Sequence, residues 1–324
     1  MRRREFIGLL GAAAGALPLS ARAQDSGRTY RLGFLIPANR DAPAVLAMFD
    51  ELRRNGFVEG QNLIVIPESG FGISSDRLGD LPVALVTAAP DAIISGPDLH
   101  TRSLQRLTRT IPLIGMTEDM VAAGLVESLD RPGSNTTGIS LLSPELDGKR
   151  QDLLIEAVPG ARRMAALADS RITPPRHLEA LRESARARGI ELSILGVGKS
   201  DEIVSAIDSA KMAGAEALNV LATPLFFVNG RMVIERVAAL HLPAIYQWPD
   251  MAEQGGLVGY GPRFAEVYRQ RARMATRILR GTKPADVPVE QPTRFELVVN
   301  LRTAKAIGHQ FPVALLQRAD QVIE

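Results

Sequence analysis

Polar side chains follow several short apolar runs of this chain, each at the point where a run ends. The acids among them, Asp98, Glu118 and Asp119, can accept charge-assisted hydrogen bonds from an ammonium group. Trp248, the single tryptophan, offers an aromatic surface. This chemistry suits non-covalent recognition of a small molecule. The predicted ligand-binding residues are Asn39, Ser95, Gly96, Asp98, Thr117, Glu118, Asp119, Ser143, Asp169, Ser170, Thr223, Tyr246, Gln247 and Trp248.

Some of these residues also have a purely structural interpretation. Asp98 and Asp169 stand where acids commonly cap helices, so each is equally a candidate cap. Trp248 follows Tyr246 at a predicted strand end, where it either stacks on a ligand or packs beside a hinge.

The sequence displays no catalytic or metal-binding constellation. There is no cysteine, and therefore no thiolate nucleophile and no disulfide. The alternation of strands and helices is similar to that of a dinucleotide-binding enzyme. However, Gly196-Val197-Gly198 lacks the third glycine of the G-x-G-x-x-G motif of such enzymes. The four histidines are isolated in sequence, which favours packing or surface roles over metal binding: His100, His177, His241 and His309. We therefore expect no enzyme activity, no cofactor and no metal.

The elements that position the candidate residues alternate between apolar runs and segments with helical spacing. Val45, Met48, Phe49 and Leu52 recur at i, i+3, i+4 and i+7, as on one face of a helix. Runs that are apolar at consecutive positions suit parallel strands covered on both faces. A first series of runs lies at 32–37, 62–69, 91–96 and 111–116, and a second at 137–143, 163–170, 191–198, 216–224 and 242–249. The pattern predicts an α/β protein with two sheets.

Two lobes with a cleft between them are the simplest architecture for these series. A long amphipathic helix is expected from Phe264, and the proline-rich segment 283–292 reads as extended chain crossing between lobes. We expect lobe 1 to comprise 30–137 plus 262–292, and lobe 2 to comprise 138–261 plus 293–324.

The first 23 residues have the layout of a cleaved secretory signal, with an arginine start, an apolar run and Ala21-Arg22-Ala23. Arg3-Arg4-Glu5-Phe6-Ile7 resembles a twin-arginine export signal, and an ordinary signal with a basic start is the alternative. Residues 1–23 carry four arginines and one glutamate, so the chain beyond them has a net charge of about −1 although the whole chain carries +2. Basic and acidic residues are interleaved there, which argues against nucleic acid as a partner.

Four segments carry a family resemblance: 122–140 (AAGLVESLDRPGSNTTGIS), 145–163 (ELDGKRQDLLIEAVPGARR), 255–262 (GGLVGYGP) and 283–308 (KPADVPVEQPTRFELVVNLRTAKAIG). Together they resemble the ABC-transporter substrate-binding proteins of the tryptophan/tyrosine-type group, related to the leucine/isoleucine/valine-binding proteins. The resemblance covers the chain beyond the signal.

The resemblance implies a type I periplasmic binding fold, with two Rossmann-like lobes, parallel sheets and three hinge crossings. It also implies a monomeric periplasmic subunit that closes on a small organic solute, such as an amino acid or an aromatic compound, and delivers it to an ABC permease in the inner membrane. The alternatives are a periplasmic ligand-sensing partner of a receptor and, with less support, a Rossmann-like periplasmic enzyme.

One loop departs from the group. Relatives commonly place glycine followed by Ser or Thr at the position of Ser95-Gly96-Pro97-Asp98, which supplies hydroxyl donors to a ligand carboxylate, whereas an acid ends this loop here. Relatives also carry an aspartate before the segment that matches 123–126, and Asp119 corresponds to it with a spacing that differs by two residues. Three acids in one lobe favour a ligand with an ammonium or several hydroxyl groups over a simple acid.

Overall fold

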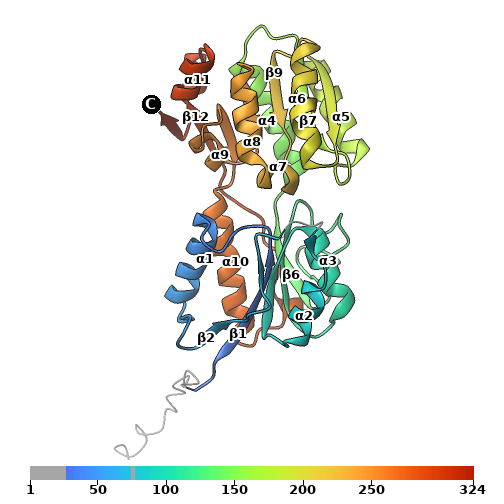
Figure 1. Cartoon of the computed structure of the whole chain (residues 1–324), viewed down its shortest axis with the longest axis vertical. Helices are drawn as coiled ribbons and strands as arrows, with labels where there is room; N and C mark the ends of the chain where they lie inside the picture. The colour runs from blue at the N-terminus through green and yellow to red at the C-terminus, as the bar shows by residue number, and fades with distance from the viewer. Residues whose placement is uncertain (1–26, 74–76) are drawn as a thin grey trace, which may run out of the picture.

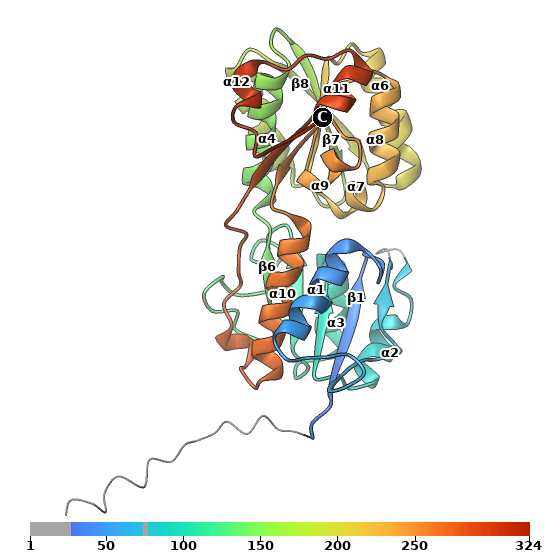
Figure 2. The ribbon, with the colours of Figure 1, turned by 90° about the vertical axis from the view of Figure 1, so that its left-hand side faces the viewer.

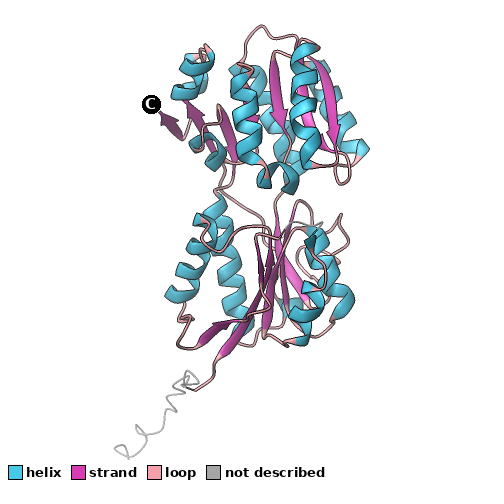
Figure 3. Cartoon of the chain, in the orientation of Figure 1, coloured by secondary structure: helices cyan, strands magenta, loops and turns pink. Residues whose placement is uncertain are grey.

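The computed structural model describes residues 27–73 and 77–324, so the predicted export signal lies outside the described residues. Two lobes, each a sheet with helices on both faces, stand one above the other (Figures 1 and 3). Their strands are mostly parallel, which confirms the predicted α/β fold class. None of the helices in the described residues has both the length and the apolarity needed to cross a membrane.

Lobe 1 is built on a parallel sheet with the strand order β2-β1-β4-β5-β6, in which β3 also pairs with β1. Its strands are β1 (Tyr30–Ile36), β2 (Leu63–Val65), β3 (Gly70–Phe71), β4 (Ala92–Ser95), β5 (Leu113–Thr117) and β6 (Thr136–Ser140). Its helices are α1 (Pro43–Arg54), α2 (Leu81–Thr87), α3 (Asp98–Leu107), α10 (Phe264–Leu279) and the short η3 (Pro284–Asp286).

Lobe 2 is built on a sheet with the order β13-β12-β11-β10-β9-β7-β8, in which only the β11–β12 pair is antiparallel. Its strands are β7 (Arg163–Asp169), β8 (Glu191–Val197), β9 (Ala217–Val220), β10 (Ala244–Tyr246), β11 (Val258–Gly261), β12 (Glu296–Asn300) and β13 (Gln321–Ile323). Its helices are α4 (Ser143–Ala157), α5 (Pro175–Ala187), η2 (Ser200–Glu202), α6 (Ile203–Met212), α7 (Pro224–Val228), α8 (Gly230–Ala239), α9 (Pro249–Glu253), α11 (Leu301–Ile307) and α12 (Val313–Leu316).

Helix α10 packs beside α1 on one face of the lobe 1 sheet, although more than 200 residues separate them in sequence (Figure 2). Val45, Met48 and Leu52 of α1 are fully buried at the predicted spacing. The stripe of α10 that begins at Phe264 and Val267 is buried as well. Burial of these two apolar stripes against each other is what fixes α10, and with it one hinge crossing, to lobe 1.

The chain passes between the sheets three times, at 141–142, 262–263 and 291–295. Strand β6 pairs with β5 over its whole length, from Thr136 to Ser140. The expectation that the run from 137 opens the second sheet is therefore wrong: the expected lobe boundary at 137/138 falls inside the last strand of the first sheet. The segment before the third crossing lies along β6, where the Thr137 hydroxyl donates to the carbonyl of Val287 at 2.6 Å.

Candidate functional site

A cavity of about 480 Å³ lies between the lobes and takes residues from both. Lobe 1 supplies the loops at the carboxyl ends of β4 and β5, and lobe 2 supplies the starts of α4, α5 and α7. Open α/β sheets bind small molecules at such strand ends. We call this space the outer compartment; it is lined by Pro97, Asp98, Thr117, Glu118, Asp119, Ala122, Ala123, Glu145, Ile172, Pro174, Arg176, His177 and Pro224.

A second, smaller cavity of about 30 Å³ adjoins the first, because Pro97, Thr117, Glu118 and Pro224 line both. We call it the inner compartment. Its remaining lining is largely apolar and aromatic: Pro37, Met116, Leu141, Thr223, Phe227, Gln247, Trp248 and Phe264. Its volume is enough for a water molecule or two but not for an aromatic ring. Entry of a ring therefore requires this compartment to widen.

The walls of the inner compartment meet at the hinge. Phe264, the first residue of α10, lies directly after the second crossing and packs on Trp248 and Phe227 of lobe 2, with ring centroids 4.8 and 4.5 Å apart. Trp248 is 5% exposed, and its indole N–H has no hydrogen-bond acceptor within the described residues. Trp248 thus packs at the hinge and also lines the cavity, and its stacking on a ligand stays a prediction.

In lobe 1, backbone and side-chain contacts hold the acidic loop in place. Asp119 Oδ1 accepts hydrogen bonds from the backbone N–H groups of Val121 and Ala122, both at 3.0 Å. Behind this loop, the fully buried Arg271 of α10 donates to the carbonyl oxygens of Ser95 and Ile114 at 2.5 and 3.2 Å. Burial lowers the pKa of Arg271. The carboxyl end of β4 and the first part of β5 are therefore fastened to the helix that follows the hinge.

In lobe 2, a buried carboxylate joins three elements. Asp147 of α4 is 2% exposed and accepts from Arg150 Nη1 at 2.7 Å and from the backbone N–H of Ala222 at 3.1 Å, both through Oδ1. Its Oδ2 lies 3.1 Å from Nε2 of His177, in the first turn of α5. Asp147 therefore ties α4, α5 and the end of β9 together below the outer compartment.

Arg150 extends this network to the hinge. Its side chain is almost wholly buried, with Nε donating to the carbonyl of Tyr260 at 2.7 Å and Nη2 to the carbonyl of Gln247 at 3.0 Å. Burial lowers the pKa of Arg150, and Asp147 opposes that shift. A side chain at Gly261 would come within 2.4 Å of the Gln247 carbonyl, which is why this strand end requires glycine. Arg150 thus holds the strand ends that carry Gln247 and the second crossing.

The structure brings half of the predicted residues to the two compartments: Asp98, Thr117, Glu118, Asp119, Thr223, Gln247 and Trp248. Asp98 is the first residue of α3, and the cap position before it is occupied by Pro97. The Thr223 hydroxyl accepts from the N–H of Phe226 and so caps α7. Binding by these seven residues stays a prediction.

Other predicted residues line neither compartment. Ser95 is fully buried and shares a hydrogen bond of 2.9 Å with Thr101, and the Tyr246 side chain lies in the lobe 2 core against Gly256. Asp169 is buried and pairs with Arg171 at 3.2 Å. Asn39 is exposed beside Gly72, and Gly96 is buried beside Met116. Ser170 lies at the edge of the lobe 2 sheet. For Ser143 the structure gives only a place at the start of α4.

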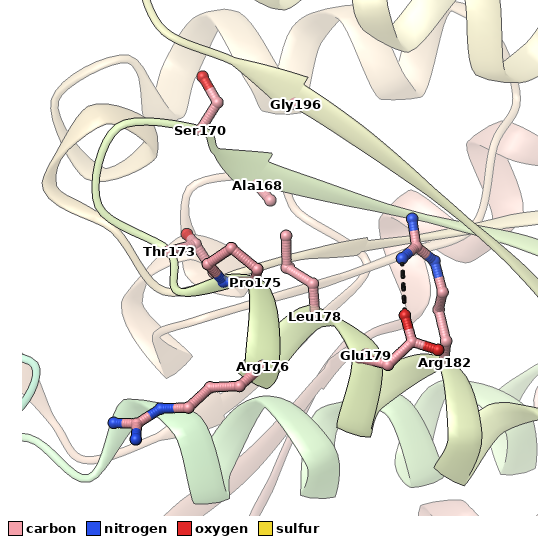
Figure 4. Close-up of a pocket in the computed structure, with 9 residues that line it drawn as sticks. All are labelled: Ala168, Ser170, Thr173, Pro175, Arg176, Leu178, Glu179, Arg182 and Gly196. Carbon is pink, nitrogen blue, oxygen red and sulfur yellow. Dashed lines mark hydrogen bonds and ion pairs between the residues drawn. The ribbon is translucent and has the colours of Figure 1, made fainter.

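Ser170 lines a separate pocket of about 480 Å³ at the β7–β8 edge of lobe 2 (Figure 4). Its wall includes Ala168 and Gly196, and Arg182 pairs with Glu179 at 3.1 Å along α5. In Figure 4 the guanidinium of Arg176 points away from the other labelled side chains. All lining residues belong to lobe 2, so lobe closure would not enclose a ligand here.

The sequence reasoning missed several residues of the cleft. The sequence did not indicate a binding role for Phe227, Phe264, Glu145 or Arg176. For His177 it indicated a packing or surface role. These side chains lie within the first turns of the helices that follow the strand-end loops, just beyond the loop residues that the sequence indicated.

The comparisons with known proteins agree with this architecture. The family described as ABC transporter substrate binding protein matches residues 52–323. The chain is 27% identical to the tyrosine-binding protein of Clostridioides difficile (strain R20291) over 208 residues, which cover 63% of this chain and 59% of that protein's length.

Solved structures show the same fold. An ABC domain from Streptococcus pneumonia, in complex with L-Trp, has a TM-score of 0.78 at 22% identity and covers 91% of this chain and 100% of that one. A conserved domain protein from Vibrio cholerae has a TM-score of 0.79 at 24% identity, with 91% and 99% covered. A ligand-free, open substrate binding protein with adhesive properties from Clostridium difficile gives 0.64 at 23%, with the same coverage. These likenesses confirm the type I periplasmic binding fold.

The family match spans most of the chain, the fold is that of its solved relatives, and the cavity lies between the lobes as ligand capture by such a fold requires. The protein therefore belongs to the ABC transporter substrate binding protein family.

Proposed function

We propose that this protein is the periplasmic solute-binding subunit of an ABC importer and captures an aromatic amino acid, or a closely related solute, by closure of its two lobes. The observation that carries the proposal is one continuous cleft with two chemically different compartments. The outer compartment presents acids to an ammonium group, and the inner one presents aromatic and apolar side chains to a ring.

The relatives support this ligand class. The similar curated protein is named for tyrosine binding, and one similar structure holds L-Trp. The outer compartment would hold the polar head of such a ligand, and the inner compartment would hold its aromatic side chain. In this proposal the protein catalyses nothing, acts as a monomer and hands its ligand to an inner-membrane permease, after export through the signal in residues 1–23.

Lobe motion is part of the proposal, because the inner compartment is too small for a ring as it stands. Three extended crossings join the lobes, and the contacts of Phe264 with Trp248 and Phe227 are those that must loosen when a ring enters. Hinge closure of two rigid lobes around a ligand is a common way to enclose one.

A thermal-shift screen of the protein without residues 1–23 tests the function, using the twenty amino acids, tyramine, tryptamine, nucleosides and polyols. We expect L-tyrosine or L-tryptophan to raise the melting temperature most, since a ligand at 100 times its Kd stabilises the folded state by about 2.7 kcal/mol. Shifts only with sugars or nucleosides would contradict the proposed ligand class.

Replacing Asp119 with asparagine should weaken binding of an amine-bearing ligand about tenfold or more, because a charge-assisted hydrogen bond is worth roughly 1.5–3 kcal/mol. Asparagine keeps an oxygen that can accept from the N–H groups of Val121 and Ala122, so the loop and the melting temperature of the empty protein should change little. Isothermal titration calorimetry measures the affinity. Unchanged affinity for a verified amine ligand would remove Asp119 from the site.

A further inference from the structure

The charges around the outer compartment are divided between the lobes. Three of its four acids, Asp98, Glu118 and Asp119, belong to lobe 1. Its two basic side chains, Arg176 and His177, are neighbours on α5 of lobe 2. The fourth acid, Glu145, lies at the start of α4. A ligand between the lobes therefore meets three acids on one side, and both basic side chains together with one acid on the other.

The position of the two basic side chains is unfavourable for the empty protein. They occupy the first turn of α5, where the helix dipole is positive and where no acid of the helix itself is present. Cations at this end of a helix are destabilising, whereas an anion there is stabilised. A sequence that breaks such a local rule commonly does so at a functional site.

The two side chains differ in how they are held. His177 is oriented by Asp147, which occupies Nε2 and is itself fixed by Arg150. Within the described residues, Nδ1 of His177 and the guanidinium of Arg176 make no hydrogen bond or ion pair. Asp147 therefore fixes the orientation of the His177 ring and leaves Nδ1 available to a ligand. Within the same described residues, the Arg176 guanidinium has no partner carboxylate.

We propose that Arg176 and His177 form the subsite for the ligand's carboxylate, so that the protein recognises a zwitterion with its ammonium on lobe 1 and its carboxylate on lobe 2. This inference rests on the proposed function and deepens it. With the side chain of the ligand in the inner compartment, three substituents of one carbon are engaged. Both lobes must contribute to bind such a ligand, which couples recognition to closure.

Other charged groups surround the subsite. Around His177 lie Asp147 and Glu145 of α4, Arg150 of the same helix, Arg176 of α5, and Asp98, Glu118 and Asp119 across the cleft. The three acids across the cleft attract an ammonium and repel a carboxylate, so they favour the orientation in which the carboxylate lies on Arg176 and His177.

The test compares each amino acid with its decarboxylated amine by calorimetry: L-tyrosine with tyramine, and L-tryptophan with tryptamine. Arg176→Gln should weaken the bound amino acid about tenfold or more and leave the amine unchanged or slightly tighter, because only the amino acid carries the carboxylate. His177→Gln, which keeps a donor for Asp147, should likewise weaken the amino acid more than the amine.

The matched control is His241→Asn, a change at an exposed histidine after α8 that should leave the affinities for amino acid and amine unchanged. Equal losses for amino acid and amine in Arg176→Gln and in His177→Gln would overturn the carboxylate subsite while leaving the binding function in place. If the wild type binds neither amino acid of the two pairs, the proposed function itself fails, and this inference fails with it.

Discussion

Replacing Arg150 with methionine should lower the free energy of unfolding by about 3–5 kcal/mol, because it leaves the buried carboxylate of Asp147 without its main countercharge. The carbonyl oxygens of Gln247 and Tyr260 lose their donors at the same time. Urea unfolding followed by circular dichroism measures the change. Since Gln247 lines the inner compartment, ligand affinity should fall as well.

Two comparisons make this result specific. The double variant Arg150→Met with Asp147→Asn removes both charges and should recover part of the lost stability. Arg231→Met breaks the exposed pair with Glu235, where solvent screens the charges, and should hardly change unfolding. If the single and double Arg150 variants are equally unstable, the buried charge of Asp147 is not the cause.

Replacing Trp248 with alanine should cost about 3–5 kcal/mol of stability, as removal of a buried tryptophan does, and should also reduce affinity for a ring-bearing ligand. The affinity falls because the variant deletes the wall that Trp248 forms together with Phe264. Trp248 is the only tryptophan, so the wild type should report binding of L-tyrosine as a change in tryptophan emission.

Trp248→Phe is the matched variant, since it keeps an aromatic wall but removes the indole N–H. It should retain most of the stability and most of the affinity. A Trp248→Ala protein that binds the same ligand as tightly as the wild type would place the ring outside the inner compartment.

Much of the fold could be predicted because it rests on local patterns. Consecutive apolar runs marked the buried parallel strands, and the spacing of Val45, Met48 and Leu52 marked the buried face of α1. The assignment of β6 was wrong because periodicity identifies a strand but not the sheet that it joins. Pairing of Thr136–Ser140 with β5 is a long-range property that no local pattern contains.

The candidate site could be predicted only in outline. Strand ends indicated the right edge of each sheet but not which of their side chains reach the cleft: Ser95 and Tyr246 enter the lobe cores, whereas Thr117 and Trp248 line the cleft. The link from His177 through Asp147 to Arg150 joins residues up to 30 positions apart on two helices. Only the packing of α4 against α5 brings them together.

The central claim is that both lobes contact the ligand in the cleft. Hydrogen exchange of the protein, measured with and without saturating L-tyrosine or L-tryptophan, tests it most directly. We expect added protection in lobe 1 at 117–123 and in lobe 2 at 172–178 and 223–227, with 262–264 protected as the lobes close. Protection confined to lobe 2, around Ala168, Ser170 and Gly196, would contradict it and would move the ligand to the pocket of Figure 4.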